Sequence, residues 1–286
     1  MAELNKYESL NRNTALKKAD TASLAVPHTD ERRRLLRVTL IANAGVLLTY
    51  DGVTLMLDGI YGHEGHPFSN LKPEVWDAML CGRHPFEKVD YLLFSHNHPD
   101  HFSPEMAETF LSRRRVKGVF FPEGDAPALE HFRMSLKRSG TPAVALSGGT
   151  DHAAFQIEPR ICVRALKTLH LDRKFQNIPN YCYLLTFGNK NVLFTADADY
   201  IHETFAELAD THLRAVFVNP LFFNALRRGR FFRGHLDAET VCIYHVPFSG
   251  EDAMRMRPAL AHDLLEWQPE HPETIVLCDA FQHIDL

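Results

Sequence analysis

A histidine-rich segment of eight residues, SHNHPDHF at positions 95–102, constrains this chain more than any other feature. It contains the pattern H-x-H-x-D-H, in which three imidazoles and one carboxylate fall within six consecutive positions. Imidazole and carboxylate groups are ligands that suit zinc, iron and manganese in proteins. The segment therefore predicts a metal site formed by His96, His98, Asp100 and His101.

The flanking residues place this segment on a loop between a strand and a helix. Residues 89–94 are largely apolar and aromatic, which is typical of a buried strand. Ser103 suits the N-cap of a helix, Pro104 the first helical position, and Glu105 the first turn. Because a tight turn can direct several side chains at one point, the predicted ligands are expected to converge where the strand ends.

The pattern resembles the signature of the metallo-β-lactamase-fold superfamily, whose members hold one or two metal ions at the edge of a two-sheet sandwich. The resemblance covers residues 35–286 and implies an α/β fold, an αββα four-layer sandwich. It also implies three further ligands in a set order along the chain. His170, Asp197 and His245 each follow a predicted strand and take these three places.

The resemblance distributes the seven residues over two divalent metal ions. Zinc is the expected metal, with manganese or iron as alternatives. Asp197 takes the bridging place, because a carboxylate can span two ions through its two oxygens and a neutral imidazole cannot. His96, His98 and His170 are expected at the first ion, and Asp100, His101 and His245 at the second.

An aspartate that supports the site from behind is a further implication of the resemblance. Two apolar runs on either side of Asp51-Gly52 predict a hairpin, and Asp58 follows its second strand. Asp58 is expected to accept a hydrogen bond from a ligating imidazole. A turn role before Gly59 is the alternative. His235 competes with His245 for the last ligand place, but no strand precedes it.

Two segments are candidates for substrate contacts. The long loop over residues 60–88 leads into the metal segment and begins near Tyr61. Residues 219–236 are expected to form a loop in which arginines alternate with aromatic residues, and such a loop can hold phosphate or carboxylate groups. A solvated basic loop or a homo-oligomer contact explains it equally well. The candidate substrate-binding residues are Tyr61, Arg227, Arg228, Arg230 and His235.

The composition bears on partners and location. The net charge of −5 argues against a nucleic-acid partner. The five cysteines are scattered and form no C-x-x-C pair, which fits reduced thiols in the cytoplasm. Residues 1–34 are polar and carry charges of both signs, so they are expected to form an N-terminal extension without a signal peptide or membrane anchor.

The expected function is hydrolysis of a small-molecule lactone or phosphoester by a water that two metal ions activate, with Asp100 and Asp197 as catalytic residues that direct the proton. The chain is most similar to the cytosolic branch that includes L-ascorbate-6-phosphate lactonase. That branch often has Gly-His-Ala near the first hairpin, whereas this chain has Ala42-Asn43-Ala44. An iron-dependent sulfur dioxygenase-type oxidoreductase and a non-catalytic ligand sensor are the alternatives.

Overall fold

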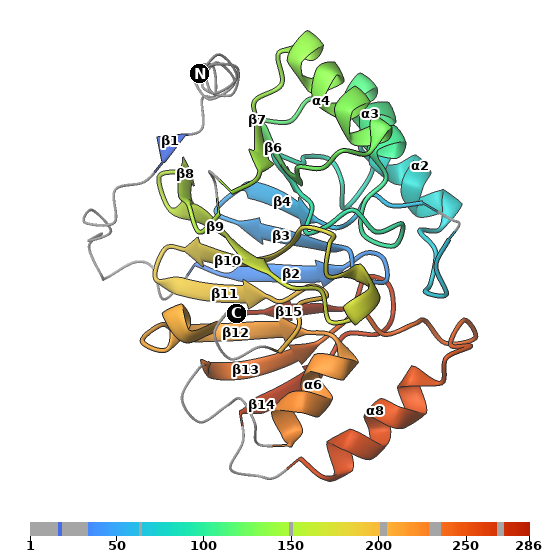
Figure 1. Cartoon of the computed structure of the whole chain (residues 1–286), viewed down its shortest axis with the longest axis vertical. Helices are drawn as coiled ribbons and strands as arrows, with labels where there is room; N and C mark the ends of the chain where they lie inside the picture. The colour runs from blue at the N-terminus through green and yellow to red at the C-terminus, as the bar shows by residue number, and fades with distance from the viewer. Residues whose placement is uncertain are drawn as a thin grey trace.

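The structure is a computed structural model that describes residues 17–18, 34–62, 65–148, 151–200, 205–228, 236–267 and 272–286. Within these ranges, two β-sheets pack face to face and helices cover their outer sides. Figure 1 shows α2, α3 and α4 grouped beside one sheet and α6 and α8 beside the other. The αββα four-layer sandwich expected from the sequence is therefore confirmed.

The seven-stranded sheet comes mainly from the N-terminal half of the chain and has the order β15-β2-β3-β4-β5-β6-β7. Strands β2, β3 and β4 pair antiparallel, as the Asp51-Gly52 turn predicts. Strands β4 to β7 run parallel. The strands are β2 (Leu36–Leu40), β3 (Val46–Tyr50), β4 (Val53–Leu57), β5 (Tyr91–Leu93), β6 (Gly118–Pro122), β7 (Ala143–Leu146) and β15 (His283–Asp285).

The eight-stranded sheet has the order β1-β8-β9-β10-β11-β12-β13-β14. Its strands are antiparallel from β8 to β11 and parallel from β11 to β14. Two residues of the predicted N-terminal extension pair with β8, and residues 1–16 and 19–33 lie outside the described ranges. The strands are β1 (Lys17–Lys18), β8 (Ala154–Glu158), β9 (Ile161–Thr168), β10 (Asn180–Phe187), β11 (Lys190–Phe194), β12 (His212–Val218), β13 (Asp237–Ile243) and β14 (Glu273–Val276).

Alternation along the strands divides the apolar side chains among three layers of core. On β10, Tyr181 and Tyr183 join the cluster between the sheets, whereas Cys182 and Leu184 join the cluster under the outer helices. Successive side chains of a strand point to opposite faces, so a sheet that is covered on both faces is apolar throughout. The sequence Asn180–Phe187 has this composition.

The helices begin and end where local sequence signals predict. The Ser103 hydroxyl accepts a hydrogen bond from the Met106 backbone N–H at 3.2 Å and caps α3. Gly140 ends α4 with a φ of 67°, which a glycine adopts without steric cost. The helices are α2 (Pro73–Cys81), α3 (Pro104–Arg113), α4 (Pro127–Ser139), α6 (Pro220–Arg227) and α8 (Met256–Leu265), with short 3-10 turns η2 (Arg173–Phe175) and η3 (Ala206–Leu208).

The expectation that residues 219–236 form a loop is wrong for its first part, because Pro220–Arg227 is the helix α6. The Asn219 side chain accepts from the Phe222 backbone N–H at 2.9 Å, and Pro220 occupies the first helical position. Asn followed by Pro is a helix start signal, which the arginines that follow obscured. Residues 229–235 lie outside the described ranges.

None of the helices within the described ranges has the length and apolar character that a membrane span requires.

Candidate metal centre

All seven predicted ligands follow strands at one edge of the sandwich. His96 to His101 follow β5, His170 follows β9, Asp197 follows β11 and His245 follows β13. Parallel strands direct their carboxyl ends to the same edge of a sheet, and β4, β5, β11, β12 and β13 take part in such pairs. A backbone bridge between His96 and Asn180 joins the two sheets, and a bridge between His170 and Ala198 joins two loops of the eight-stranded sheet.

The structure brings the seven side chains into two groups that share one carboxylate. In each group, the candidate ligand atoms all lie within 4.8 Å of one another. Asp197 belongs to both groups, as a bridging residue requires. The first group is His96, His98, His170 and Asp197, and the second is Asp100, His101, Asp197 and His245.

The two oxygens of Asp197 face different neighbours. Its Oδ2 lies 3.6 Å from Nε2 of His170 and 4.0 Å from Nε2 of His96. Its Oδ1 lies 3.6 Å from Nε2 of His245. Oδ2 also lies 3.6 Å from Nε2 of His101, so this oxygen stands close to both groups.

The donor atoms fit a divalent cation because several of them are buried without another partner. Nε2 of His170 and Oδ2 of Asp100 have no hydrogen-bond partner among the described residues. Nε2 of His101 and Nε2 of His245 face each other at 3.0 Å, although they are on rings from distant segments. Leaving buried polar atoms unpaired costs roughly 1–3 kcal/mol each. A cation held by these imidazoles and carboxylates would satisfy them.

The electrostatic environment favours the protonation states that bind metals at His96, His98 and Asp197. Burial lowers the pKa of His96 well below its ordinary value and, with His170 nearby, lowers that of His98 to about 4. Burial opposes ionisation of Asp197, but the facing imidazoles of His245 and His101 outweigh it and hold the pKa of this carboxyl below its ordinary value. Neutral imidazoles and ionised carboxylates are the forms that bind metals. At His101, burial lowers the pKa, but the carboxylates of Asp100, Asp197 and Asp58 outweigh it and raise the pKa well above its ordinary value, so a metal ion must displace a proton there.

Asp58 lies directly behind the ligands, contacts His101 directly and reaches His96 through Ser95. Its Oδ1 accepts from the Ser95 backbone N–H at 2.8 Å, and its Oδ2 accepts from the Ser95 hydroxyl at 2.6 Å. Nδ1 of His101 lies 2.9 Å from the same Oδ2, and the Ser95 oxygen lies 3.0 Å from Nδ1 of His96. One fully buried carboxylate thus orients two candidate ligands. Sequence patterns did not indicate Ser95, although it directly precedes the first histidine.

Further contacts to the candidate ligands come from residues that carried no signal of their own. Nδ2 of Asn219 lies 3.2 Å from Oδ1 of Asp197. The Asp172 backbone N–H donates to Nδ1 of His170 at 3.0 Å. Nδ2 of Asn43 lies 2.7 Å from Nδ1 of His245. The contacts of Asn219 and Asn43 join segments that are distant in the sequence and meet only in the folded chain. The contact of Asp172 is local.

Among the described residues, three of the seven non-glycine residues with a positive φ lie at the candidate metal centre. Asp58, Ala196 and His245 have φ values of 48°, 48° and 58°, in the left-handed region. Such conformations are costly for residues other than glycine and persist where the surrounding structure over-determines them. The three strained residues are therefore held in place by the packing around the candidate metal centre.

The candidate substrate-binding residues lie in different surroundings. Tyr61 is fully buried, and its hydroxyl donates to the Ser69 carbonyl at 2.6 Å. Arg227 is at the end of α6 and forms ion pairs with Asp263, at 3.1 Å, and with Glu266. Arg228 is exposed. Arg230 and His235 lie outside the described residues.

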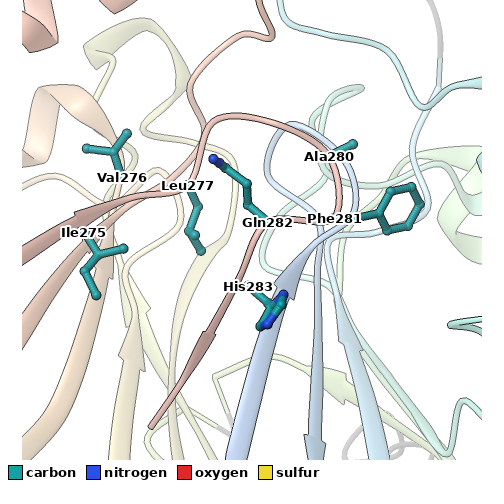
Figure 2. Close-up of a pocket in the computed structure, with 7 residues that line it drawn as sticks. All are labelled: Ile275, Val276, Leu277, Ala280, Phe281, Gln282 and His283. Atoms are coloured by element: carbon teal, nitrogen blue, oxygen red, sulfur yellow. The ribbon is translucent and has the colours of Figure 1, made fainter.

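A separate pocket of about 530 Å³ lies where the last strands of the two sheets meet. Figure 2 shows its lining residues, which come from β14, β15 and the turn between them. None of the seven candidate ligands lines it. The lining residues are Ile275, Val276, Leu277, Ala280, Phe281, Gln282 and His283.

The fold is similar to that of several solved structures of low sequence identity. YhfI from Bacillus subtilis, a metallo-β-lactamase fold protein, is 16% identical with a TM-score of 0.56, and the match covers 88% of this chain and 99% of YhfI. Igni18, a metallo hydrolase from Ignicoccus hospitalis, is 12% identical with a TM-score of 0.53, and the match covers 88% of this chain and 98% of Igni18.

CmlA, a diiron β-hydroxylase from Streptomyces venezuelae, is 18% identical with a TM-score of 0.54. The match covers 91% of this chain but 55% of CmlA, so the chain spans about half the length of that protein. At these identities the likeness concerns the fold. A search of curated proteins found no match.

The family model of the β-lactamase superfamily domain matches residues 71–254, which is more than half of the chain. This range contains all seven candidate ligands, and Asp58 lies before it. The chain therefore belongs to the β-lactamase superfamily, with the metallo-β-lactamase fold.

Proposed function

We propose that the protein is a hydrolase that uses two divalent metal ions, with zinc as the expected metal, to cleave a small-molecule lactone or phosphoester. The observation that carries this proposal is the position of Asp197. Its carboxylate belongs to both groups of candidate ligands, and its oxygens face imidazoles of both. A shared carboxylate between two sets of donors is the arrangement that a dinuclear site needs.

When bound, the two ions lower the pKa of a coordinated water toward neutrality and polarise the bond under attack. The residues of the chain supply the geometry. Asp58 and Ser95 fix the orientation of the His96 and His101 rings, so their donor atoms need little rearrangement to bind a metal ion. Oδ2 of Asp100 has no hydrogen-bond partner among the described residues, and an ionised carboxylate there can accept a hydrogen bond from the attacking water and orient it.

Aromatic rings beside both groups support a compact organic substrate. The Phe68 ring lies 4.4 Å from the His245 ring, and the Phe175 ring lies 4.4 Å from the His98 ring, measured between centroids. Both phenylalanines are partly exposed. Pockets for small organic ligands commonly combine such apolar walls with a few convergent polar groups. The lactone or phosphoester is proposed from the resemblance to the lactonase branch, and no nucleic-acid partner is proposed, given the net charge of −5.

An iron-dependent oxidoreductase is the second candidate. Imidazole and carboxylate donors also bind iron, and the structurally similar CmlA is a diiron β-hydroxylase. Elemental analysis of the purified protein, combined with a panel of lactones and phosphoesters, separates the two. Two zinc or manganese ions per chain with turnover of a lactone or phosphoester support the proposal. Iron with oxygen consumption and no hydrolysis contradicts it, and bound metal without any turnover favours a ligand sensor.

A further inference from the structure

Asn43 is a fully buried side chain whose contact with His245 the proposed chemistry does not yet use. It lies in the turn between β2 and β3, about 200 positions before the histidine that it contacts. Its side-chain Nδ2 lies 2.7 Å from Nδ1 of His245. Its Oδ1 is buried without a hydrogen-bond partner among the described residues. In this orientation the amide oxygen, which is the side chain's one acceptor, is unused.

The other nitrogen of the same imidazole faces the second group of candidate ligands. Nε2 of His245 lies 3.0 Å from Nε2 of His101, 3.4 Å from Oδ2 of Asp100 and 3.6 Å from Oδ1 of Asp197. Nε2 is therefore the atom of His245 that faces the candidate metal centre. A neutral imidazole carries one proton, so metal binding at Nε2 requires that proton on Nδ1.

An N–H at Nδ1 needs an acceptor. Of the two polar atoms of the Asn43 amide, only the oxygen can accept a hydrogen bond. If Nδ2 of Asn43 donated to Nδ1 instead, the ring proton would lie on Nε2 and point at the other ligands. The oxygen and nitrogen of an amide exchange places by a 180° rotation of the group, and the hydrogen-bond network decides between them. A metal at Nε2 therefore selects the orientation in which Oδ1 of Asn43 faces Nδ1 of His245.

A chain of buried hydrogen bonds links the backbone at Asn43 to the backbone just after His245. The Asn43 backbone N–H donates to the Tyr61 oxygen at 3.2 Å, and the Tyr61 hydroxyl donates to the Ser69 carbonyl at 2.6 Å. The Ser69 hydroxyl oxygen accepts from the Phe248 backbone N–H at 2.7 Å, three residues beyond His245. The chain thus fixes both ends of the Asn43–His245 contact through buried hydrogen bonds.

The same turn is also packed tightly against the support of His101. A Cβ atom at Gly45 would come within 2.8 Å of the Gly59 Cα and 3.0 Å of the Asp58 carbonyl oxygen. Asp58 in turn contacts His101. The turn between β2 and β3 therefore packs against Asp58, which contacts His101, and itself carries Asn43, which contacts His245.

We propose that Asn43 is a positioning residue for the second metal ion, and that its side-chain oxygen accepts the Nδ1–H of His245 and so makes Nε2 the ligand atom. The proposal rests on the proposed two-metal function. It assigns Tyr61 to the frame that holds Asn43 rather than to substrate binding. It also gives a chemical role to the position where this chain differs from the Gly-His-Ala of the lactonase branch.

The test compares Asn43→Leu, which removes the acceptor at similar size, with Asn43→Asp, which keeps an acceptor and removes the donor. Zn²⁺ titration against a chromophoric chelator gives the stoichiometry and the two affinities. We expect Asn43→Leu to lower the affinity for the second ion by about 10- to 100-fold, with the first ion retained. Asn43→Asp should bind both ions at least as tightly as the wild type. Asn224→Leu, the same change on α6 beside Asp263, is the control and should bind both ions normally.

The ¹⁵N resonances of the wild-type histidines, with zinc added, provide a second measurement that does not depend on whether the variant folds. Nδ1 of His245 should be protonated and coupled to its hydrogen. Unchanged binding of both ions by a folded Asn43→Leu, or an unprotonated Nδ1 in the zinc-loaded wild type, would overturn the role of Asn43 and leave the two-metal function standing. A wild-type chain that binds no second ion would overturn both.

Discussion

At the scale of single residues, the candidate centre depends on how two oxygens of one carboxylate are placed. Asp197 follows β11 after a residue with a φ of 48°, and this turn aims its side chain between the two groups. Asn219 fixes Oδ1 from the outside, at 3.2 Å. Asp199, two residues further, is only partly buried, and it belongs to neither group. The two aspartates therefore form a matched pair for substitution.

Asp197→Asn keeps the shape of the side chain and removes its charge. A hydrolase should lose kcat by roughly 10³-fold at pH 7, because the second ion binds more weakly and the pKa of the attacking water rises. Part of the activity should return at higher pH, where hydroxide forms with less help. Steady-state kinetics over a range of pH values measure both effects.

Asp199→Asn serves as the control and should leave kcat within a few-fold of the wild type. A ligand sensor would show changed affinity for its ligand and no recovery of turnover with pH. Near wild-type kcat in Asp197→Asn would contradict the two-metal mechanism.

His245→Ala should lower the metal content from two ions per chain toward one, because His245 contributes only to the second group. The first group keeps all four of its residues, so one ion should remain bound. Metal analysis by mass spectrometry after gel filtration measures the ratio. His262→Ala, at an exposed histidine on α8, is the matched control. Two ions retained by the His245→Ala protein would show that His245 is not a ligand.

At the scale of elements, α6 links the candidate centre to the outer layer of the molecule. Its N-cap residue, Asn219, contacts Asp197, whereas its last residue, Arg227, contacts Asp263 of α8 and Glu266 directly after α8. A helix of eight residues is roughly 12 Å long, so these two roles lie at opposite ends. The Phe223 ring also packs on Trp267, beyond the end of α8, at 5.0 Å between centroids.

Arg227→Ala should therefore lower stability rather than substrate affinity. The substitution leaves the buried Asp263 carboxylate without its arginine, at a cost of roughly 1–3 kcal/mol. Thermal unfolding of the metal-loaded protein measures the loss. The KM of the variant should match that of the wild type for neutral substrates and for anionic substrates alike. Arg228→Ala, at the exposed neighbour, should leave the unfolding temperature unchanged. A rise in KM for anionic substrates alone, with no loss of stability, would instead place Arg227 in substrate binding.

At the scale of the whole molecule, the candidate centre joins two sheets that meet mainly through apolar side chains, with a few polar contacts such as the Tyr91 hydroxyl on the Ile157 carbonyl. His96 to His101 come from the seven-stranded sheet, and His170, Asp197 and His245 come from the eight-stranded sheet. A ligand that binds only the folded chain stabilises it by about 2.7 kcal/mol at a free concentration 100-fold above its Kd. Bound metal should accordingly stabilise the sandwich as a unit.

Removal of metal with a chelator should lower the unfolding temperature by about 5 °C or more, given a shift of roughly 2–4 °C per kcal/mol for a protein of this size. Zn²⁺ added back should restore it. Differential scanning calorimetry of the loaded, stripped and reloaded protein measures the change. The His245→Ala protein should show a smaller shift, and an identical unfolding temperature with and without chelator would contradict a structural contribution from the metal.

The sequence by itself determined the strand–loop–helix context of the H-x-H-x-D-H segment, because strand burial, N-capping and turn formation depend on neighbouring residues. It also placed Asp58, His170, Asp197 and His245 at strand ends, with the resemblance supplying which strand ends belong together. Local signals were weaker for α6, where arginines and aromatics suggested a loop although Asn219 and Pro220 start a helix.

The tertiary structure alone decided which ligand each supporting polar group meets, since the resemblance implied an imidazole next to Asp58 but did not say which one. Asn43 and His245 are separated by 202 positions, and Asp58 and His101 by 43, yet each pair is in hydrogen-bonding distance. No periodicity or local propensity encodes such a contact, since it arises where two sheets and their loops pack together. The orientation of each imidazole, and with it the nitrogen that faces the candidate metal centre, is therefore a property of the packed sandwich and not of any segment within it.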